Sequence, residues 1–426
     1  MTSKWKVYTV YKSAKMFCLQ NKEIFIIMIH STCKSIILIL FFIIFTIGCV
    51  NNEESISTTY TISQKIGNRS TVPVFYPWSG PCRTDILWFD CDTTETPYSL
   101  VWTSQGWVTD LESLSTNISK EQKKRMEEDG NTLYLISDEW HYYYPRYRSL
   151  SKDSKYYLNE EFKYHQNSEY GHTLVINFEH TEWPALLAEK ALNYKNQGFD
   201  GLIFDWWHND AGNGRSSIRV EKARLSIAKE IRSKVGNDFI LMGNVNWGTN
   251  DPTSAYLSGV FLELWKDSIS AHYPIDNQTT TRSIEAMEGL LQYWNTNLVS
   301  PKIIAFEPWK ITTSDYVSDR TNETNIKYAK LFTAMALVIA DNGYILYADN
   351  NDDASGGDHQ HYYYDFYKTN LGNPISDIIT VKTGVAYKKY ETGVIAYNRT
   401  PSLVDVKLEN GKQFQINSLE GVFLQE

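Results

Sequence analysis

The sequence has few cysteines and fewer basic than acidic residues, and each shortage excludes a class of protein. There are five Cys in 426 residues, and none of their spacings is that of a zinc site. Lys and Arg number 41 against 50 Asp and Glu, which gives a formal net charge of −9. A nucleic-acid-binding protein needs a basic surface to neutralise phosphates, so we do not expect nucleic acid as a partner.

The chain also lacks a hydrophobic run of the roughly 20 residues that a comfortable membrane span needs. The apolar run Ile36–Gly48 follows Lys34 and ends directly before Cys49. A cation, a short apolar run and a small residue before Cys are typical of a lipoprotein signal. We therefore expect residues 1–49 to be a signal segment with lipidation at Cys49, and the rest to be secreted or lipid-anchored at the cell surface. An uncleaved membrane anchor is the alternative.

Beyond residue 72 the sequence alternates between two hydrophobic patterns. Short, continuously apolar runs predict buried strands, and segments with apolar residues at helical spacing predict amphipathic helices. This alternation favours a parallel sheet covered by helices. The predicted strands are residues 86–90, 132–137, 173–177, 201–205, 239–243, 259–263, 302–306 and 344–348, and the clearest predicted helices are residues 183–197, 217–235, 281–297 and 323–339.

Eight such units predict the α/β class and a (β/α)8 TIM barrel over residues 72–375. A doubly wound sheet is the alternative, but the sequence lacks the Gly-rich phosphate turn that such sheets usually carry. Residues 50–71 are polar and rich in Ser and Thr, and we expect a tether there. From residue 376 apolar and polar residues alternate between turn signals, so residues 376–426 are predicted to form a small antiparallel β domain.

Polar and aromatic residues follow almost every predicted strand. The active site of a (β/α)8 barrel lies at the C-terminal ends of its strands. Acids and amides can bond to sugar hydroxyls, and aromatic rings can pack on sugar C–H faces, so we expect an oligo- or polysaccharide as partner. The candidate substrate-binding residues are Asp90, Glu139, Trp140, Asn177, Glu179, Trp206, Trp207, His208, Asn244, Trp247, Trp265, Glu307, Trp309 and Asp349.

Two of the acids at strand ends are predicted to be catalytic. Cleavage of a glycosidic bond needs one carboxyl group to protonate the leaving oxygen and another to attack the sugar or activate water. Asp205 ends the fourth predicted strand and Glu263 the sixth, so their carboxyl groups can face each other across the barrel mouth. Glu179 and Glu307 occupy comparable positions and could replace Glu263. The pair is compatible with either retention or inversion.

Three motifs give this reading a family resemblance. The series "GFDGLIFDWW", "LMGNVNWG" and "GVFLELW", followed by a short β module, resembles the (β/α)8 glycoside-hydrolase-like families of secreted microbial proteins. The acid placement is similar to that of α-galactosidase-type barrels, which have a nucleophilic Asp on strand 4 and an acidic proton donor on strand 6. The resemblance implies that Asp205 is the nucleophile and Glu263 the acid/base. The sequence departs from that type at Trp206 and Trp207, and in having Glu where Asp is usual on strand 6.

Other functions are weighed against this hypothesis. A non-catalytic carbohydrate-binding surface lipoprotein would use the same scaffold and aromatic residues without needing two opposed carboxyls. A metal-dependent deacetylase would need a His/Asp cluster, for which the sequence offers only His359 and His361. The Asp-rich loop that begins at Asp349 resembles a calcium loop, but Ala354 stands where Gly is required. We therefore predict no metal and no cofactor, and expect a monomer.

Overall fold

The computed structural model describes residues 60–79, 98–103, 118, 120–143, 156, 165–167, 171–209, 216–264, 283–308, 321–347 and 362–425. The chain divides into two compact units, Met1–Ser57 and Thr58–Glu426, and all described residues belong to the second. The predicted signal with Cys49, residues 50–59 of the predicted tether and the predicted strand at residues 86–90 lie outside the described residues, whereas residues 60–71 are described and contain a helix, Ile62–Gly67.

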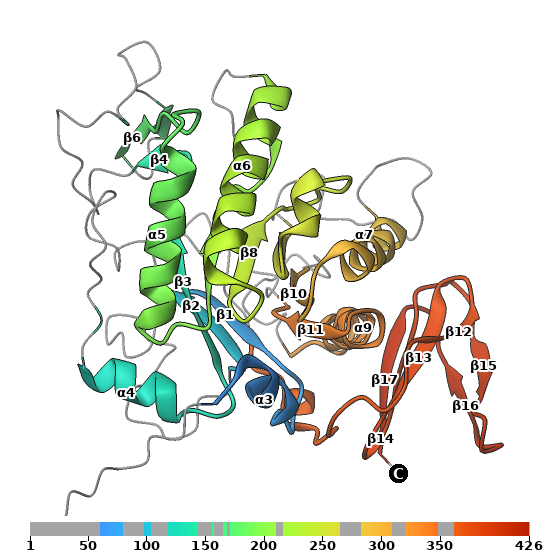
Figure 1. Ribbon diagram of the computed structural model, residues 1–426. Helices are drawn as coiled ribbons and strands as arrows, with labels where there is room; N and C mark the ends of the chain where they lie inside the picture. The colour runs from blue at the N-terminus through green and yellow to red at the C-terminus, as the bar shows by residue number, and fades with distance from the viewer. Residues whose placement is uncertain are drawn as a thin grey trace, which may run out of the picture. The chain divides into compact units, whose positions relative to one another are not determined.

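Eight parallel strands form the central sheet (Figure 1). They are hydrogen-bonded in chain order, and a parallel bridge between Val74 and Ile345 joins the last strand to the first. The sheet is therefore a nearly closed barrel, which confirms the predicted (β/α)8 fold. Its strands are β1 (Phe75–Ser79), β2 (Leu100–Thr103), β3 (Leu133–Asp138), β7 (Gly201–Phe204), β8 (Ile240–Asn244), β9 (Gly259–Glu263), β10 (Ile303–Glu307) and β11 (Asn342–Ile345).

Helices cover the outside of this barrel (Figure 1). They are α4 (Lys120–Glu128), α5 (Trp183–Asn196), α6 (Ser217–Val235), α7 (Ile284–Asn297) and α9 (Glu323–Ile339), so all four predicted helices are confirmed. Their starts follow capping chemistry: the Ser283 side chain accepts a hydrogen bond from Ala286 N at 3.0 Å, and that of Asn322 accepts one from Thr324 N at 2.9 Å.

The N-terminal end of the barrel is closed by α3 (Ile62–Gly67). Lys65 of this helix donates a 2.8 Å hydrogen bond to Asp200, the residue directly before β7. Both side chains are buried, and Asp200 also accepts the Tyr134 backbone N–H at 2.8 Å. Burial raises the pKa of Asp200, and the nearby Lys65 cation opposes that rise. This polar pair fixes the end of the barrel opposite to the predicted active site.

The barrel differs from the predicted strand list in two places. The predicted third strand is wrong, because β6 (Gly171–Val175) pairs antiparallel with β4 (Tyr142–Tyr143) and β5 (His165–Asn167) in a separate sheet. Conversely, β1 and β2 are barrel strands that the hydrophobic pattern does not predict. β1 and β2 stand in the strand order where the prediction has residues 86–90 and 173–177, so β7 is still the fourth barrel strand and β9 the sixth.

Three aromatic rings identify the interior of the barrel. The rings of Phe75 in β1 and Trp102 in β2 stack with their centroids 5.3 Å apart. Both rings contact Phe261 of β9, across the barrel, at centroid distances of 5.7 and 5.0 Å. Contacts between non-neighbouring strands require these side chains to point inward. Because side chains alternate along a strand, Glu263 points inward as well.

The residues after the barrel form two antiparallel sheets beside α9 (Figure 1). The larger packs closely on α9: a Cβ at Gly421 would lie 2.1 Å from the Lys330 carbonyl oxygen, and Tyr390 Oη donates to the Leu337 carbonyl at 2.9 Å. Its strands are β12 (Ile379–Lys382), β13 (Val385–Tyr390), β14 (Gly393–Asn398) and β17 (Glu420–Gln425), and the smaller sheet pairs β15 (Val404–Lys407) with β16 (Gln413–Ile416).

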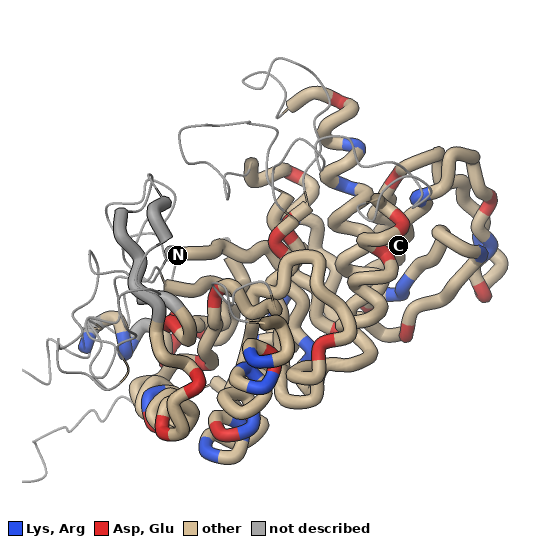
Figure 2. Tube along the Cα trace, turned by 90° about the horizontal axis from the view of Figure 1, so that it is seen from above, with Lys and Arg blue, Asp and Glu red and all other residues tan. Residues whose placement is uncertain are grey.

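Charged residues of both signs are interspersed over the outer helices and the C-terminal sheets of the described chain (Figure 2). Among the described helices, none is both long and apolar enough to cross a membrane.

Candidate active site

Strand register places four polar residues on the inner face of the barrel at its C-terminal end. Asn244 pairs with the inward Phe261, and Glu307 pairs with the inward Glu263. Ile203 pairs with Met242, which lies two residues before Asn244, so Asp205 continues the inward series directly after β7. The barrel thus brings together Asp205, Asn244, Glu263 and Glu307, all four of which are predicted site residues.

Asn244 bonds to both predicted catalytic acids. Its Nδ2 donates to Asp205 Oδ1 at 2.8 Å and to Glu263 Oε2 at 2.5 Å. The two bonds share one nitrogen, so these carboxylate oxygens lie at most 5.3 Å apart. Asp205 and Glu263 are half-buried, whereas Asn244 is 2% exposed. The carboxyl groups therefore meet at the barrel mouth with the amide below and between them.

A second hydrogen bond orients the Asp205 carboxylate. Its Oδ1 atom also accepts the backbone N–H of Trp206 at 2.9 Å, so two donors converge on this one oxygen. The backbone of Asp205 is held too, because its carbonyl oxygen accepts a 2.9 Å bond from Trp140 Nε1. Two N–H donors favour the ionised form of a carboxyl group.

The consecutive residues Trp206 and Trp207 lie in opposite environments. Trp206 has a φ of 52°, which is rare for a residue other than Gly, and is 38% exposed. Trp207 is fully buried, stacks on Phe204 at 5.2 Å, and donates its indole N–H to Thr253 Oγ1 at 2.9 Å. The left-handed turn at Trp206 therefore presents one ring to solvent beside Asp205 and directs the next behind the strand.

Trp140 is likewise a packing residue in this structure. It is fully buried, contacts Trp207 edge to face at 5.2 Å, and lies beneath the Asp205 backbone. The substrate-contacting role predicted for Trp140 and Trp207 does not fit two rings with no exposed surface. Of the described tryptophans on the predicted list, Trp206 and the half-buried Trp247 have surface available to a ligand.

Two histidines lie next to tryptophans of the site: His141 beside Trp140, and His208 beside Trp206. Burial lowers the pKa of His141 well below its usual value, and the proximity of His208 lowers it further, so the His141 ring is neutral near pH 7. His208 is half-buried, and its ring lies 5.5 Å from that of Trp206. A neutral imidazole beneath the site contributes no positive charge to it.

The remaining predicted residues are divided among three locations. Glu139 directly follows β3 and is buried. Asn177 and Glu179 lie between β6 and α5, outside the barrel strands, and Glu179 forms a double hydrogen bond with Arg219 at 2.8 and 2.5 Å. This location makes Glu307 a nearer alternative to Glu263 than Glu179 is. Asp90, Trp265, Trp309 and Asp349 lie outside the described residues.

One supporting residue, Arg224 of α6, was not predicted. It is 1% exposed, and its guanidinium donates to the Trp207 carbonyl at 3.1 Å and to Asp251 Oδ2 at 2.5 Å. It thereby joins the loop after β7 to the loop after β8, next to the acids. The helical spacing of the sequence could have identified Arg224, because it falls on the same face of α6 as the buried residues Val220 and Ile227.

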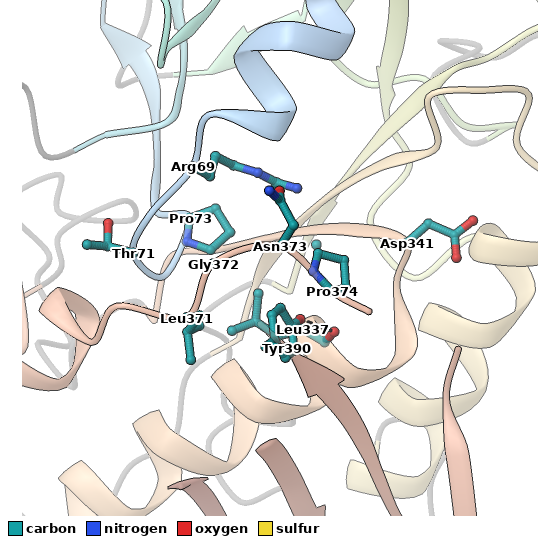
Figure 3. A pocket seen from close by; sticks show the side chains of 11 residues that line it. Arg69, Thr71, Pro73, Leu337, Asp341, Leu371, Gly372, Asn373, Pro374 and Tyr390 are labelled. Carbon is teal, nitrogen blue, oxygen red and sulfur yellow. Dashed lines mark hydrogen bonds between the residues drawn. The ribbon is translucent and has the colours of Figure 1, made fainter. Parts of the chain in front are cut away.

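A separate pocket lies at the opposite end of the barrel (Figure 3). It is formed where the segment before β1, the start of β11 and the chain leading to the C-terminal sheets meet, and its lining includes Arg69, Asp341 and Tyr390. None of the predicted site residues contributes to it. Within the described ranges, no group of three or more His, Cys, Asp or Glu residues could hold a metal ion.

The fold and the residues above define a (β/α)8 barrel with an acidic site at the C-terminal ends of its strands. No protein-family model matches the chain, and no curated protein sequence matches it. Similar solved structures include Amy13B of Eubacterium rectale, with 11% identity, 85% of this chain and 98% of that chain covered, and a TM-score of 0.49. A maltogenic amylase from S. marinus is 10% identical, with 84% of this chain and 66% of that chain covered and a TM-score of 0.48.

A third similar structure is the cyclic α-maltosyl-(1→6)-maltose hydrolase of Arthrobacter globiformis, which is 10% identical, with 82% of this chain and 98% of that chain covered and a TM-score of 0.47. This chain thus spans about two thirds of the S. marinus enzyme and nearly all of the other two. At these identities the likeness is one of fold, and the fold assignment rests on the chain's own sheet order.

Proposed function

We propose that this protein is a glycoside hydrolase that uses Asp205 and Glu263 to cleave glycosidic bonds of an extracellular glycan. The observation that carries the proposal is the shared hydrogen bonding of both carboxylates to Asn244 at the barrel mouth. Two carboxyl groups within reach of one sugar ring are the minimum machinery of glycosidic cleavage. A protein that merely bound sugars would not need them so close together.

The spacing of the two acids supports a retaining mechanism. Carboxyl groups of retaining enzymes are about 5–5.5 Å apart, whereas inverting enzymes need about 6.5–9.5 Å to admit a water molecule. The two oxygens that accept bonds from Asn244, Asp205 Oδ1 and Glu263 Oε2, are at most 5.3 Å apart. Asp205 is the proposed nucleophile, because two N–H donors already stabilise its negative charge.

In the first step, an Asp205 oxygen bonds to the anomeric carbon while the bond from that carbon to the leaving oxygen breaks. Glu263 gives its proton to the leaving oxygen, which departs as an alcohol. In the second step, Glu263 takes a proton from water as the water oxygen attacks the anomeric carbon, and the Asp205 ester bond breaks. The hydrolysed sugar leaves, and both carboxyl groups return to their starting protonation states.

The surroundings of the pair support a carbohydrate ligand. The exposed Trp206 ring stands next to Asp205, where it can pack on the C–H face of a sugar bound in reach of the nucleophile. Trp265, Trp309, Asp90 and Asp349 remain candidate contacts on the evidence of the sequence. We further propose, from the sequence of residues 1–49, that lipidation at Cys49 or an uncleaved anchor holds the enzyme at the cell surface.

Screening the purified protein on a panel of oligo- and polysaccharides tests the proposal, with Asp205→Asn and Glu263→Gln as inactivating variants. Glu189→Gln is the matched control, because Glu189 is a half-exposed acid on the outer surface of α5, paired with Lys234. We expect cleavage by wild type and control, and a loss of at least about 100-fold in each active-site variant. Equal glycan binding by all four proteins without cleavage would instead favour a carbohydrate-binding surface lipoprotein.

A further inference from the structure

We propose that Asn244 is a positioning residue that sets the spacing and orientation of the two carboxyl groups, an inference that rests on the proposed function. The sequence suggests only a substrate contact at this position. However, Asn244 is 2% exposed, and its Nδ2 atom is engaged with both acids. It ends β8, the strand between those of Asp205 and Glu263, and so is the residue whose side chain can reach both.

The bonding pattern specifies which carboxylate oxygens react. An amide nitrogen is a donor only, so Asp205 Oδ1 and Glu263 Oε2 must both act as acceptors. Asp205 Oδ1 accepts a second bond from Trp206 N, so we assign the attack to Oδ2. Glu263 Oε2 accepts the bond from Asn244, so we assign the transferable proton of Glu263 to Oε1. One amide would thus turn both reactive oxygens away from each other and toward the substrate.

Asn244 is itself held from behind the strand. The backbone carbonyl oxygen of Asn244 accepts a hydrogen bond from the backbone N–H of Trp207 at 2.6 Å. The side-chain oxygen of Asn244, Oδ1, lies 3.4 Å from the backbone nitrogen of Asn246. The Trp207 ring occupies the space left by Gly243, where an added Cβ would lie 2.6 Å from the indole. Rotating the amide would turn its oxygen toward two carboxylate oxygens, so repulsion between acceptors favours the observed orientation.

A positioning role makes a specific kinetic prediction. Misplacement of a reacting group by about 1 Å can cost about 100-fold in rate, and here both reacting groups lose their common support. Removal of the amide should therefore lower kcat and leave KM within about threefold. An activated aryl leaving group needs no proton, so it should restore the first step, measured as kcat/KM, in a variant of Glu263 but only in part in Asn244→Ala, because the nucleophile is misplaced as well.

The test compares Asn244→Ala and Asn244→Asp with Asn325→Ala on the glycan identified by the panel and on its activated aryl glycoside. Asn325 is the matched control: it is fully buried in α9, and its side chain donates to Tyr364 Oη at 2.8 Å and accepts from Tyr347 Oη at 2.7 Å. Its loss should lower stability without changing kcat per folded molecule. Circular dichroism and thermal unfolding give the folded fraction of each variant.

Asn244→Asp keeps the volume of the side chain and separates positioning from folding. Near neutral pH it places an additional carboxylate between the two acids, and we expect a loss of more than about 100-fold. In mildly acidic buffer the new carboxyl gains a proton and can donate one hydrogen bond, so its kcat relative to wild type should rise as the pH falls. A merely structural role would give no such recovery.

Each outcome has one meaning. A kcat loss at unchanged KM, with acid recovery of Asn244→Asp and an unaffected Asn325→Ala, supports the inference. An active wild type whose folded Asn244 variants keep kcat, or lose it only through KM, overturns the inference and leaves the proposed function standing. A wild type that cleaves no glycan overturns the proposed function, and the positioning role falls with it.

Discussion

Glu263 and Glu307 stand side by side, as register partners at the ends of the neighbouring strands β9 and β10. Register partners on parallel strands point to the same face about 4.8 Å apart, so the barrel mouth holds a third carboxyl group next to the proposed acid/base. Glu263 is half-buried, whereas Glu307 is 3% exposed. Glu263, the more accessible of the two, is better placed to reach a leaving oxygen. The buried Glu307 is better placed to change the proton affinity of Glu263.

This arrangement predicts different effects for the two Glu→Gln substitutions. Glu263→Gln should lower kcat/KM about 10²- to 10⁴-fold on a natural glycan, and an activated leaving group should restore kcat/KM, because the first step then needs no proton donor although the second still lacks its general base. Glu307→Gln should keep most of kcat, and the alkaline limb of its pH–rate profile should move to lower pH. That shift follows because a neighbouring negative charge no longer helps Glu263 to retain its proton. If leaving-group activation rescues Glu307→Gln and not Glu263→Gln, the two roles are reversed.

The paired tryptophans provide a test of binding against packing. Trp206→Ala should raise KM about tenfold, equivalent to about 1.4 kcal/mol of lost sugar contact, with little change in stability. Trp207→Ala should lower the free energy of unfolding by about 3–5 kcal/mol, because it empties a fully buried site. Urea titration and Michaelis–Menten kinetics on both variants check this. Equal KM values for Trp206→Ala and wild type would contradict a platform role.

The sequence predicts the parts of the site that depend on strand ends. Asp205 and Glu263 could be chosen because an acid closes an apolar run, and alternation along a strand then fixes their direction. The (β/α)8 class followed from the alternation of patterns, and α5, α6, α7 and α9 are nearly where their periodicity places them. These features are local, so a local pattern is sufficient to find them.

The features that the sequence does not predict depend on which distant segment each part of the chain pairs with or packs against. The apolar run of β6 has the composition of a barrel strand, but it pairs antiparallel with β4 and β5. β1 contains Pro77 and β2 is short, so neither has a strong strand pattern. Trp206 is exposed and Trp207 buried because of one positive φ angle, at Trp206. Asn244 bonds to both acids because of the register between three strands.

Close packing of the C-terminal sheet on α9 predicts opposite effects for two Gly→Ala substitutions. Gly421→Ala should destabilise the protein, because a Cβ would lie 2.1 Å from the backbone oxygen of Lys330 and would push β17 away from the helix. At Gly289, within α7, an added Cβ would meet nothing within 4 Å beyond the adjoining residues and backbone of its own helix, so Gly289→Ala should stabilise the protein by about 0.5–1 kcal/mol through helix propensity. Thermal unfolding of both variants provides the measurement, and an unchanged or raised Tm for Gly421→Ala would contradict the close contact.

A buried lysine in the same interface predicts a pH dependence of stability. Lys388 of β13 is 3% exposed and donates to the Ala340 carbonyl at the end of α9 at 2.6 Å. Burial lowers its pKa to about 8, an effect that Arg69 reinforces and that Asp341 and Asp377 oppose. The unfolded chain keeps this proton up to about pH 10.4. Between these values the unfolded state binds more protons than the folded state, so Lys388 makes stability rise with pH from about pH 8.

The expected contribution approaches about 1.4 kcal/mol per pH unit between pH 8 and 9.5, and the ionisation of tyrosines, which begins in the same range, is common to the proteins compared and cancels between them. Lys388→Met should remove this part of the slope, because it leaves no group to titrate. Lys389→Met is the matched control, since the adjacent ammonium lies nearer the surface and pairs with Glu409. Urea unfolding of the three proteins at several pH values measures the slopes. Equal slopes for wild type and Lys388→Met would show that Lys388 does not release its proton in the folded state within this range.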